Sequence, residues 1–314
     1  MIRRSFLLTA LAALLAVPMA GYAQDLATVP GWTPALGQKH TWKIVEVKEK
    51  ARSGYTPRFD DRRAELTQHM TVLGTTLSGY SVGWDFDPPD QSFEANRFQQ
   101  AIMEIYGVEK LSIGVDRGGM PLIAYGAEAR DQRVESYAAS LPPDLEQERN
   151  LLTGFRYHAS EDPIFEVQLF VRPAMLIGRL QRAEAWTARK GETFRLQQND
   201  HIYDARITGE AEFKVEDIDI AARRITISWV WDIPLDRLPI AMRRHITELM
   251  SQTAGQAAVL PLPLRGDAGS ASFTYRGKAQ ISLEDGSLLS AEEERSQRIG
   301  FGTDFLTTTI TRQP

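Results

Sequence analysis

The chain has 314 residues, of which 43% are hydrophobic and 25% are charged, proportions typical of a soluble globular protein long enough for two domains. Its formal net charge is −5, so we expect no general attraction to nucleic acid or to anionic lipid. The sequence contains no cysteine, which excludes disulfides, thiol nucleophiles and thiolate metal sites.

Residues 1–23 have the pattern of a signal peptide. Arg3 and Arg4 precede an apolar run over 6–17, and Gly21-Tyr22-Ala23 places small residues at the two positions that signal peptidase reads. We therefore expect cleavage after Ala23 and a periplasmic or secreted protein. The apolar run of about 12 residues is shorter than the about 20 that a membrane-spanning helix needs. The mature chain is thus expected to have no transmembrane segment, and an uncleaved membrane anchor is the alternative.

One motif occurs twice and divides the rest of the chain. Residues 32–37 and 186–191 both read Trp-Thr, three further residues and glycine, and a strand-like run follows each. The same order of predicted elements then follows both copies. The first copy is followed by predicted strands over 63–73 and 80–87, a helix over 93–106 and a hairpin over 111–125. The second copy is followed by predicted strands over 201–215 and 224–231, a helix over 238–250 and a hairpin over 273–298. This order indicates an internal duplication, although a β-rich chain can also produce it by chance.

The segment between the two copies is predicted to be helical. Residues 127–141 place Val134 and Leu141 on one face of a helix, and the apolar stretch over 163–180 is expected to pack between two sheets. We therefore predict an α+β fold of two related modules, each a curved antiparallel β-sheet with a helix packed on it, joined by a helical linker. The predicted boundaries are 1–23 for the signal peptide, 24–126 for the first module, 127–184 for the linker and 185–314 for the second module.

Three carboxylates are the best candidates for acid–base chemistry. Trp84 and Phe86 share one face of their predicted strand, so Asp85 and Asp87 share the opposite face. Asp232 has the matching place in the second half of the chain. Paired carboxylates cleave glycosidic bonds in many hydrolases, so these residues could act in the same way. The alternative is that they are solvent-facing strand residues with no chemical role.

Four aromatic residues are the candidate ligand-binding residues. They are Trp84 and Phe86 in the first half and Trp229 and Trp231 in the second half. Such side chains can line an apolar or sugar-binding cavity. They can equally form the core of the predicted sheets.

Other kinds of site find no support in the sequence. The five histidines have no metal-ligand spacing on a single element. The glycine-rich turns lack the spacing of a phosphate-binding loop, and no Gly-x-Ser-x-Gly motif occurs. We therefore expect no metal and no cofactor.

With the repeated Trp-Thr motif, the strand–helix order and the Asp-x-x-Gly hairpin, the mature chain resembles uncharacterised exported bacterial proteins with repeated β-rich halves. More distantly, it resembles the curved-sheet carriers of the cell envelope, such as lipoprotein-carrier-like folds. In those carriers a bent antiparallel sheet wraps a helix around an apolar cavity. No diagnostic residue carries over from them, so the resemblance implies a similar fold and no particular ligand.

These observations favour a binding or envelope-maintenance role without catalysis. The expected partner is an apolar small molecule or lipid, or an envelope protein, held in a cleft near Trp84 and Trp229. A hydrolase acting on cell-wall or carbohydrate material through the paired carboxylates is the first alternative. A structural interaction module without a ligand is the second, and it would present an exposed apolar patch instead of a cavity.

Overall fold

The structure is a computed structural model of the chain, and most of the sequence after residue 24 can be described. The described residues are 25–52, 59–86, 110–161, 164, 166–167, 171–202, 205–238, 240, 243–244, 246–248, 250–251, 271–299 and 302–313. The predicted signal peptide and the predicted helix over 93–106 lie outside them. Of the predicted helix over 238–250, the described residues from 240 onward are helical.

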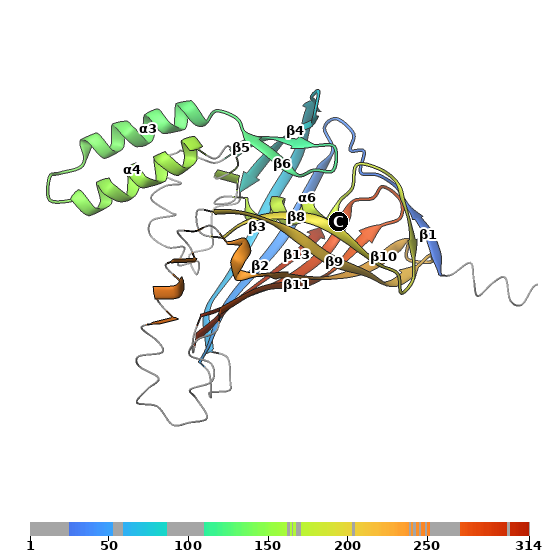
Figure 1. Ribbon diagram of the computed structural model, residues 1–314. Helices are drawn as coiled ribbons and strands as arrows, with labels where there is room; N and C mark the ends of the chain where they lie inside the picture. The colour runs from blue at the N-terminus through green and yellow to red at the C-terminus, as the bar shows by residue number, and fades with distance from the viewer. Residues whose placement is uncertain are drawn as a thin grey trace, which may run out of the picture.

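Most of the described chain belongs to one antiparallel sheet of eleven strands (Figure 1), in the order β6-β5-β4-β3-β2-β13-β12-β11-β10-β9-β8. The strands are β2 (Lys39–Arg52), β3 (Phe59–Thr75), β4 (Gly79–Phe86), β5 (Lys110–Asp116), β6 (Pro121–Ala124), β8 (Thr193–Ile202), β9 (Ala205–Asp219), β10 (Arg224–Ile233), β11 (Ala271–Ser282), β12 (Leu288–Ile299) and β13 (Gly302–Gln313). A second sheet of two strands pairs β1 (Leu26–Val29) with β7 (Trp186–Arg189).

The prediction of two modules with separate sheets is wrong, because the two halves share the large sheet. Strand β2 of the first half pairs with β13 of the second half along the register from Thr41↔Gln313 to Arg52↔Gly302. An edge strand leaves a row of backbone N–H and C=O groups without partners. Pairing β2 with the C-terminal strand satisfies those groups and joins two meanders into one sheet. The broader prediction of an α+β fold built on antiparallel β-structure is confirmed.

The turns that end the two Trp-Thr segments have the same local geometry, although Trp186–Arg189 forms β7 and Trp32 lies in no strand. Gly37 and Gly191 have φ angles of 78° and 79°, a region that glycine enters without steric cost. The Gly37 N–H donates to the Val72 carbonyl at 2.8 Å, and the Gly191 N–H donates to the Val215 carbonyl at 2.8 Å. Each of these turns therefore leads into the strand that follows it, β2 or β8, in the same way. Common descent of the two halves remains a prediction from the sequence.

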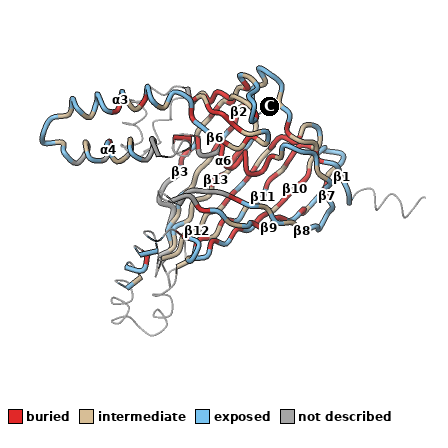
Figure 2. Tube along the Cα trace, turned by 45° about the horizontal axis from the view of Figure 1, so that its top comes forward, coloured by how far each residue is buried: buried red, intermediate tan, exposed pale blue. Residues whose placement is uncertain are grey.

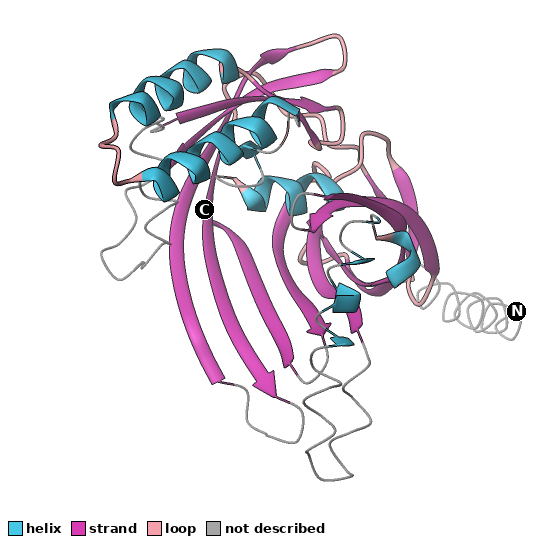
Figure 3. Cartoon of the chain, turned by 60° about the vertical axis from the view of Figure 1, so that its left-hand side comes forward, coloured by secondary structure: helices cyan, strands magenta, loops and turns pink. Residues whose placement is uncertain are grey.

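Helices lie between the two halves in sequence. Helices α3 (Ala127–Ser140) and α4 (Glu146–Glu161) form a hairpin that projects from the sheet, whereas the strands curve around α6 (Arg172–Leu180) (Figures 1 and 3). Figure 2 shows that the sheet and α6 hold most of the buried residues and that α3 and α4 are largely exposed. The apolar stretch that was expected between two sheets thus supplies a buried helix on the concave face of one sheet. A short 3-10 helix, η1 (Leu235–Arg237), follows β10.

The core lies on the concave face of the sheet. One row of cross-strand partners crosses seven strands from β3 to β9 and is apolar at every position: Leu66, Ile44, Ile310, Ala291, Ala279, Ile227 and Val215. All of these except Leu66 are fully buried. The alternation that puts them inside puts polar residues such as His69 and Thr309 on the convex face.

Candidate functional site: the concave face of the sheet

The second half of the concave face is covered by α6. Trp229 and Trp231 lie on β10, which alternates buried and more exposed residues, and they are 4% and 1% exposed. Leu176 and Leu180 of α6 lie over them, and Phe213 of the neighbouring strand β9 stacks beside Trp229, with ring centroids 6.1 Å apart. The cavity left between helix and sheet is about 10 Å³, room for at most about one water molecule. The helix therefore fills this part of the concave face.

The tryptophans of β10 are held by glycines on the neighbouring strands. A Cβ atom added to Gly277 would come within 2.1 Å of the Trp229 ring, and one added to Gly209 within 2.7 Å of Trp231 Nε1. Each ring therefore lies directly on a backbone that only glycine can provide. Trp231 also meets the Tyr275 ring edge-on, with ring centroids 5.2 Å apart. These contacts give both indoles fixed positions.

A buried ion pair joins α6 to the sheet. Arg179 Nη2 donates to both carboxylate oxygens of Glu293, at 2.8 and 2.7 Å, and the two side chains are 4% and 1% exposed. Arg295 Nε donates to Glu293 Oε1 at 2.8 Å, and its guanidinium lies 4.9 Å from the centre of the Tyr275 ring. The pair is shielded from water, so loss of one partner would leave a charge buried without compensation.

The first half of the concave face carries a different group of aromatic residues. Met70 on β3 pairs with His40 on β2 and with Trp84 on β4, so these three residues form one row across the strands. Trp42 lies two residues after His40 on the same face, and the two rings are 6.1 Å apart. His40, Trp42 and Trp84 are 7%, 1% and 1% exposed. We call His40, Trp42 and Trp84 the β2–β4 cluster.

The β2–β4 cluster has polar atoms that the described residues do not satisfy. His40 Nε2, Trp42 Nε1 and Trp84 Nε1 are buried and have no hydrogen-bond partner in the described part of the chain. Most buried polar atoms in proteins have a partner, in the protein or in bound water. This part of the concave face can therefore supply hydrogen bonds to a further group.

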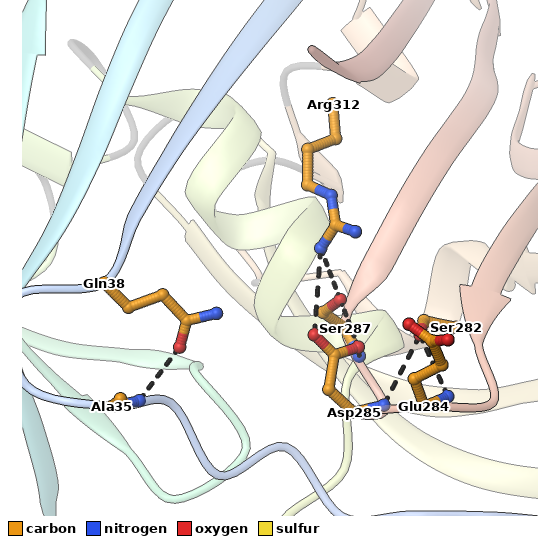
Figure 4. Close-up of polar contacts among 7 residues, drawn as sticks. All are labelled: Ala35, Gln38, Ser282, Glu284, Asp285, Ser287 and Arg312. Atoms are coloured by element: carbon orange, nitrogen blue, oxygen red, sulfur yellow. Dashed lines mark hydrogen bonds and ion pairs between the residues drawn. The ribbon is translucent and has the colours of Figure 1, made fainter. Parts of the chain in front are cut away.

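A polar network lies on the hairpin between β11 and β12. Arg312 of β13 donates from Nη1 to Ser287 Oγ at 2.6 Å and lies 4.0 Å from the Asp285 carboxylate (Figure 4). Burial raises the pKa of Asp285, but hydrogen bonds from Ser287 and Ser282 outweigh it, so the pKa is lowered overall. Burial and the Arg312 charge lower the pKa of His40, against an opposing effect of Asp285. His40 is therefore neutral near pH 7.

Of the described candidates, Trp84, Trp229 and Trp231 lie on the concave face, and Asp85 and Asp232 do not. Asp85 lies on the convex face of β4 and pairs with His69 of β3. Asp232 is exposed on β10 and accepts a hydrogen bond from Thr274 Oγ1 at 2.7 Å. Five strands separate β4 from β10, so the structure does not bring Asp85 and Asp232 together. Asp87 and the side chain of Phe86 lie outside the described part of the structure.

Sequence reasoning missed His40, Trp42, Arg179 and Glu293. The first two alternate with Ile44 on β2, so a strict period of two would have placed them on the core face. The ion pair joins residues 114 positions apart and leaves no local pattern. Within the described residues, no group of three or more His, Asp or Glu could hold a metal ion. Over the same residues, no helix is both long enough and apolar enough to cross a membrane.

No protein-family model matches the chain, and no curated protein matches it significantly. Among solved structures, one described as lipid-protein interactions in lipovitellin is similar with a TM-score of 0.41 and 10% identity, over 89% of this chain and 25% of that chain. The chain thus spans about a quarter of the length of that lipovitellin chain. The crystal structure of Ail, the attachment invasion locus protein of Yersinia pestis, is similar with a TM-score of 0.19 and 2% identity, over 88% of this chain and 99% of that chain. Scores and identities this low do not define the function of the chain.

Proposed function

We propose that the protein binds an apolar or amphiphilic small molecule of the lipid class on the concave face of its sheet, as a carrier or binding protein. The observation that carries this proposal is that the apolar concave face, buried along most of the row from Leu66 to Val215, becomes partly exposed at Leu66, Leu306 and Ile299. Burial of apolar surface is the main favourable term in binding molecules of this class. A curved sheet with one apolar face presents that surface on its concave side.

Part of the concave face remains open to a ligand. Leu66, Leu306 and Ile299 lie on this face and are only partly buried. Helix α6 has nine residues, which corresponds to a length of about 14 Å. The sheet has eleven strands, and their spacing gives a width of about 50 Å along the sheet. Helix α6 thus spans a fraction of this width, and the apolar side chains that a ligand could cover are the partly buried Leu66, Leu306 and Ile299.

The open part of the face is mixed in character, which favours an amphiphile over a pure hydrocarbon. Leu306 pairs directly with Arg295 of β12, and Gln297 lies two residues further on the same face. A long apolar chain could contact the leucine and isoleucine side chains, while a polar end stays beside the arginine and glutamine.

A charge placed on the concave face tests this proposal. We expect Leu306→Glu to weaken binding of a fluorescent phosphatidylcholine by about tenfold or more, because a carboxylate would be desolvated against the ligand. Leu306 is partly exposed, so the variant should still fold. The measurement is a fluorescence titration of the mature protein, with circular dichroism to check the fold.

The matched control is Val230→Glu on the convex face, where Val230 is 41% exposed. It adds the same charge and should leave lipid binding unchanged. Equal affinities of the two variants would place the ligand elsewhere. A wild-type protein that carries no lipid from its native source and binds none from a panel would exclude the function.

We also propose that the protein acts after export, on the basis of the signal-peptide pattern over 1–23. The intact mass of the protein recovered from a periplasmic or secreted fraction measures this directly. Loss of residues 1–23 is expected, and recovery of the full-length chain in the cytoplasm would exclude it.

A further inference from the structure

We propose that the β2–β4 cluster, His40, Trp42 and Trp84, is a polar recognition site for an uncharged hydrogen-bond acceptor of the ligand, such as the carbonyl of an acyl ester. This inference rests on the proposed lipid-binding function and names the chemical group that the concave face recognises. It assigns the cluster a role that a purely apolar core would not require.

The three side chains lie close together on one face of three adjacent strands. His40 and Trp84 share Met70 as their cross-strand partner, which puts their strands about 10 Å apart. Trp42 adjoins His40 on β2 and pairs with Gln68, the concave-face residue two positions before Met70 on β3. The cluster therefore occupies two neighbouring rows of the sheet.

Each residue of the cluster has a nine-tenths buried side chain with an unsatisfied polar atom. Trp42 and Trp84 are both 1% exposed, and neither indole N–H has a partner in the described part of the chain. His40 is 7% exposed, and its Nε2 is likewise unpartnered there. Three such atoms in one small area are unusual, because a buried polar atom without a hydrogen bond is costly.

The chemistry of these atoms selects an acceptor. An indole N–H can only donate a hydrogen bond, so two of the three atoms require an acceptor oxygen. Neutral imidazole can donate from Nε2 as well, depending on its tautomer. Arg312, the cross-strand partner of Trp42 on β13, already donates to Ser287 and lies beside Asp285. The cluster thus offers hydrogen-bond donors without a free charge, which suits a carbonyl better than a phosphate or a carboxylate.

The second half of the face provides a built-in comparison. Trp229 lies on the same face of the same sheet, but its ring rests on Gly277 and is covered by α6. Its Nε1 is not among the unsatisfied atoms of the described residues. Replacing this tryptophan by phenylalanine removes an N–H at a position that the inference does not use.

The experiment compares an ester ligand with its ether analogue. Trp42→Phe and Trp84→Phe each remove the N–H and keep an aromatic ring, and Trp229→Phe is the control. The probes are a monoacylglycerol and the monoalkylglycerol ether of the same chain length, which lacks the carbonyl. Their dissociation constants are measured by titration of the full mature chain, and thermal unfolding confirms that each variant is folded.

We expect the wild-type protein to prefer the ester, and Trp42→Phe and Trp84→Phe each to weaken ester binding about tenfold while ether binding stays unchanged. Trp229→Phe should preserve the preference. Equal binding of ester and ether by the wild-type protein would overturn the inference but leave lipid binding intact, and the unsatisfied atoms would then hold water only. An equal loss for both ligands in the variants would also overturn it. Failure of the wild-type protein to bind either ligand would contradict the proposed function itself.

Discussion

Individual buried polar residues on the concave face depend on partners that are remote in sequence. Glu293 on β12 receives hydrogen bonds from Arg179 of α6 and from Arg295, and it is 1% exposed. Such a pair contributes little net stability relative to apolar residues, but it is costly to break. It fixes α6 in one position, because any shift of the helix would separate the charges.

His40 gives the protein a pH dependence at the residue scale. Burial lowers its pKa in the folded state below the ordinary value of 6.5, so the unfolded chain binds a proton more readily. Stability should therefore be complete above about pH 6.5 and fall as the pH drops below that value towards the folded-state pKa. Urea unfolding at pH 8 and pH 5 measures the difference.

The control for this dependence is His40→Gln, which cannot titrate in this range. The loss of stability between pH 8 and pH 5 should be smaller in the variant than in the wild-type protein. Identical losses would show that other groups are responsible.

Helix α6 is the element that decides how much of the concave face is open. It packs so closely on the hairpin after β5 that a Cβ atom added to Gly178 would lie 2.5 Å from Met120 Cα and 2.7 Å from the Gly119 carbonyl oxygen. The backbone of α6 and the backbone of Gly119 and Met120 lie so close together that no side chain fits between them. The position of α6 therefore depends on glycine at this contact.

Gly178→Ala should displace α6 and destabilise the protein by about 1–3 kcal/mol, the usual cost of overpacking a well-filled contact. Gly154→Ala is the matched control, since Gly154 also lies in a helix and a Cβ atom there would meet nothing within 4 Å. That control should be neutral or more stable by up to about 1 kcal/mol. Chemical unfolding measures both variants, and equal effects would contradict the close packing of α6.

Strand β13 joins the two halves of the molecule in one sheet. This strand pairs with β12 on one side and with β2 on the other, so it connects the last hairpin of the second half to the first long strand of the first half. Strands of one continuous sheet share a core, and we expect the two halves to unfold together.

Thr309→Pro tests this cooperativity. Thr309 pairs with Val45 and Glu292 at the middle of β13, and proline there removes a ladder hydrogen bond. We expect the free energy of unfolding to fall by about 3 kcal/mol or more. The fall should be the same in β3–β4 and in β9–β10. Hydrogen exchange read by mass spectrometry reports each region, and Thr309→Val is the control. A loss confined to one half would show that the halves fold independently.

The sequence by itself determined the local pattern of this protein. Its period-two alternation put Trp84 on the opposite strand face from Asp85, and its glycine turns indicated the hairpins. These features depend on neighbouring residues only, which is why they can be read from one chain. Whether the tryptophans line a cavity or form core stayed open in the sequence, and in the structure Trp84, Trp229 and Trp231 are buried.

Only the tertiary structure decided that there is one sheet instead of two, and that α6 lies against its concave face. The physical reason is that strand pairing is made by backbone hydrogen bonds, which are the same for every residue type except proline. Nothing in the sequence of β2 or β13 therefore identifies the other as its partner. The sequence likewise does not identify Arg179 and Glu293 as partners, because they meet only where the fold brings α6 and β12 together.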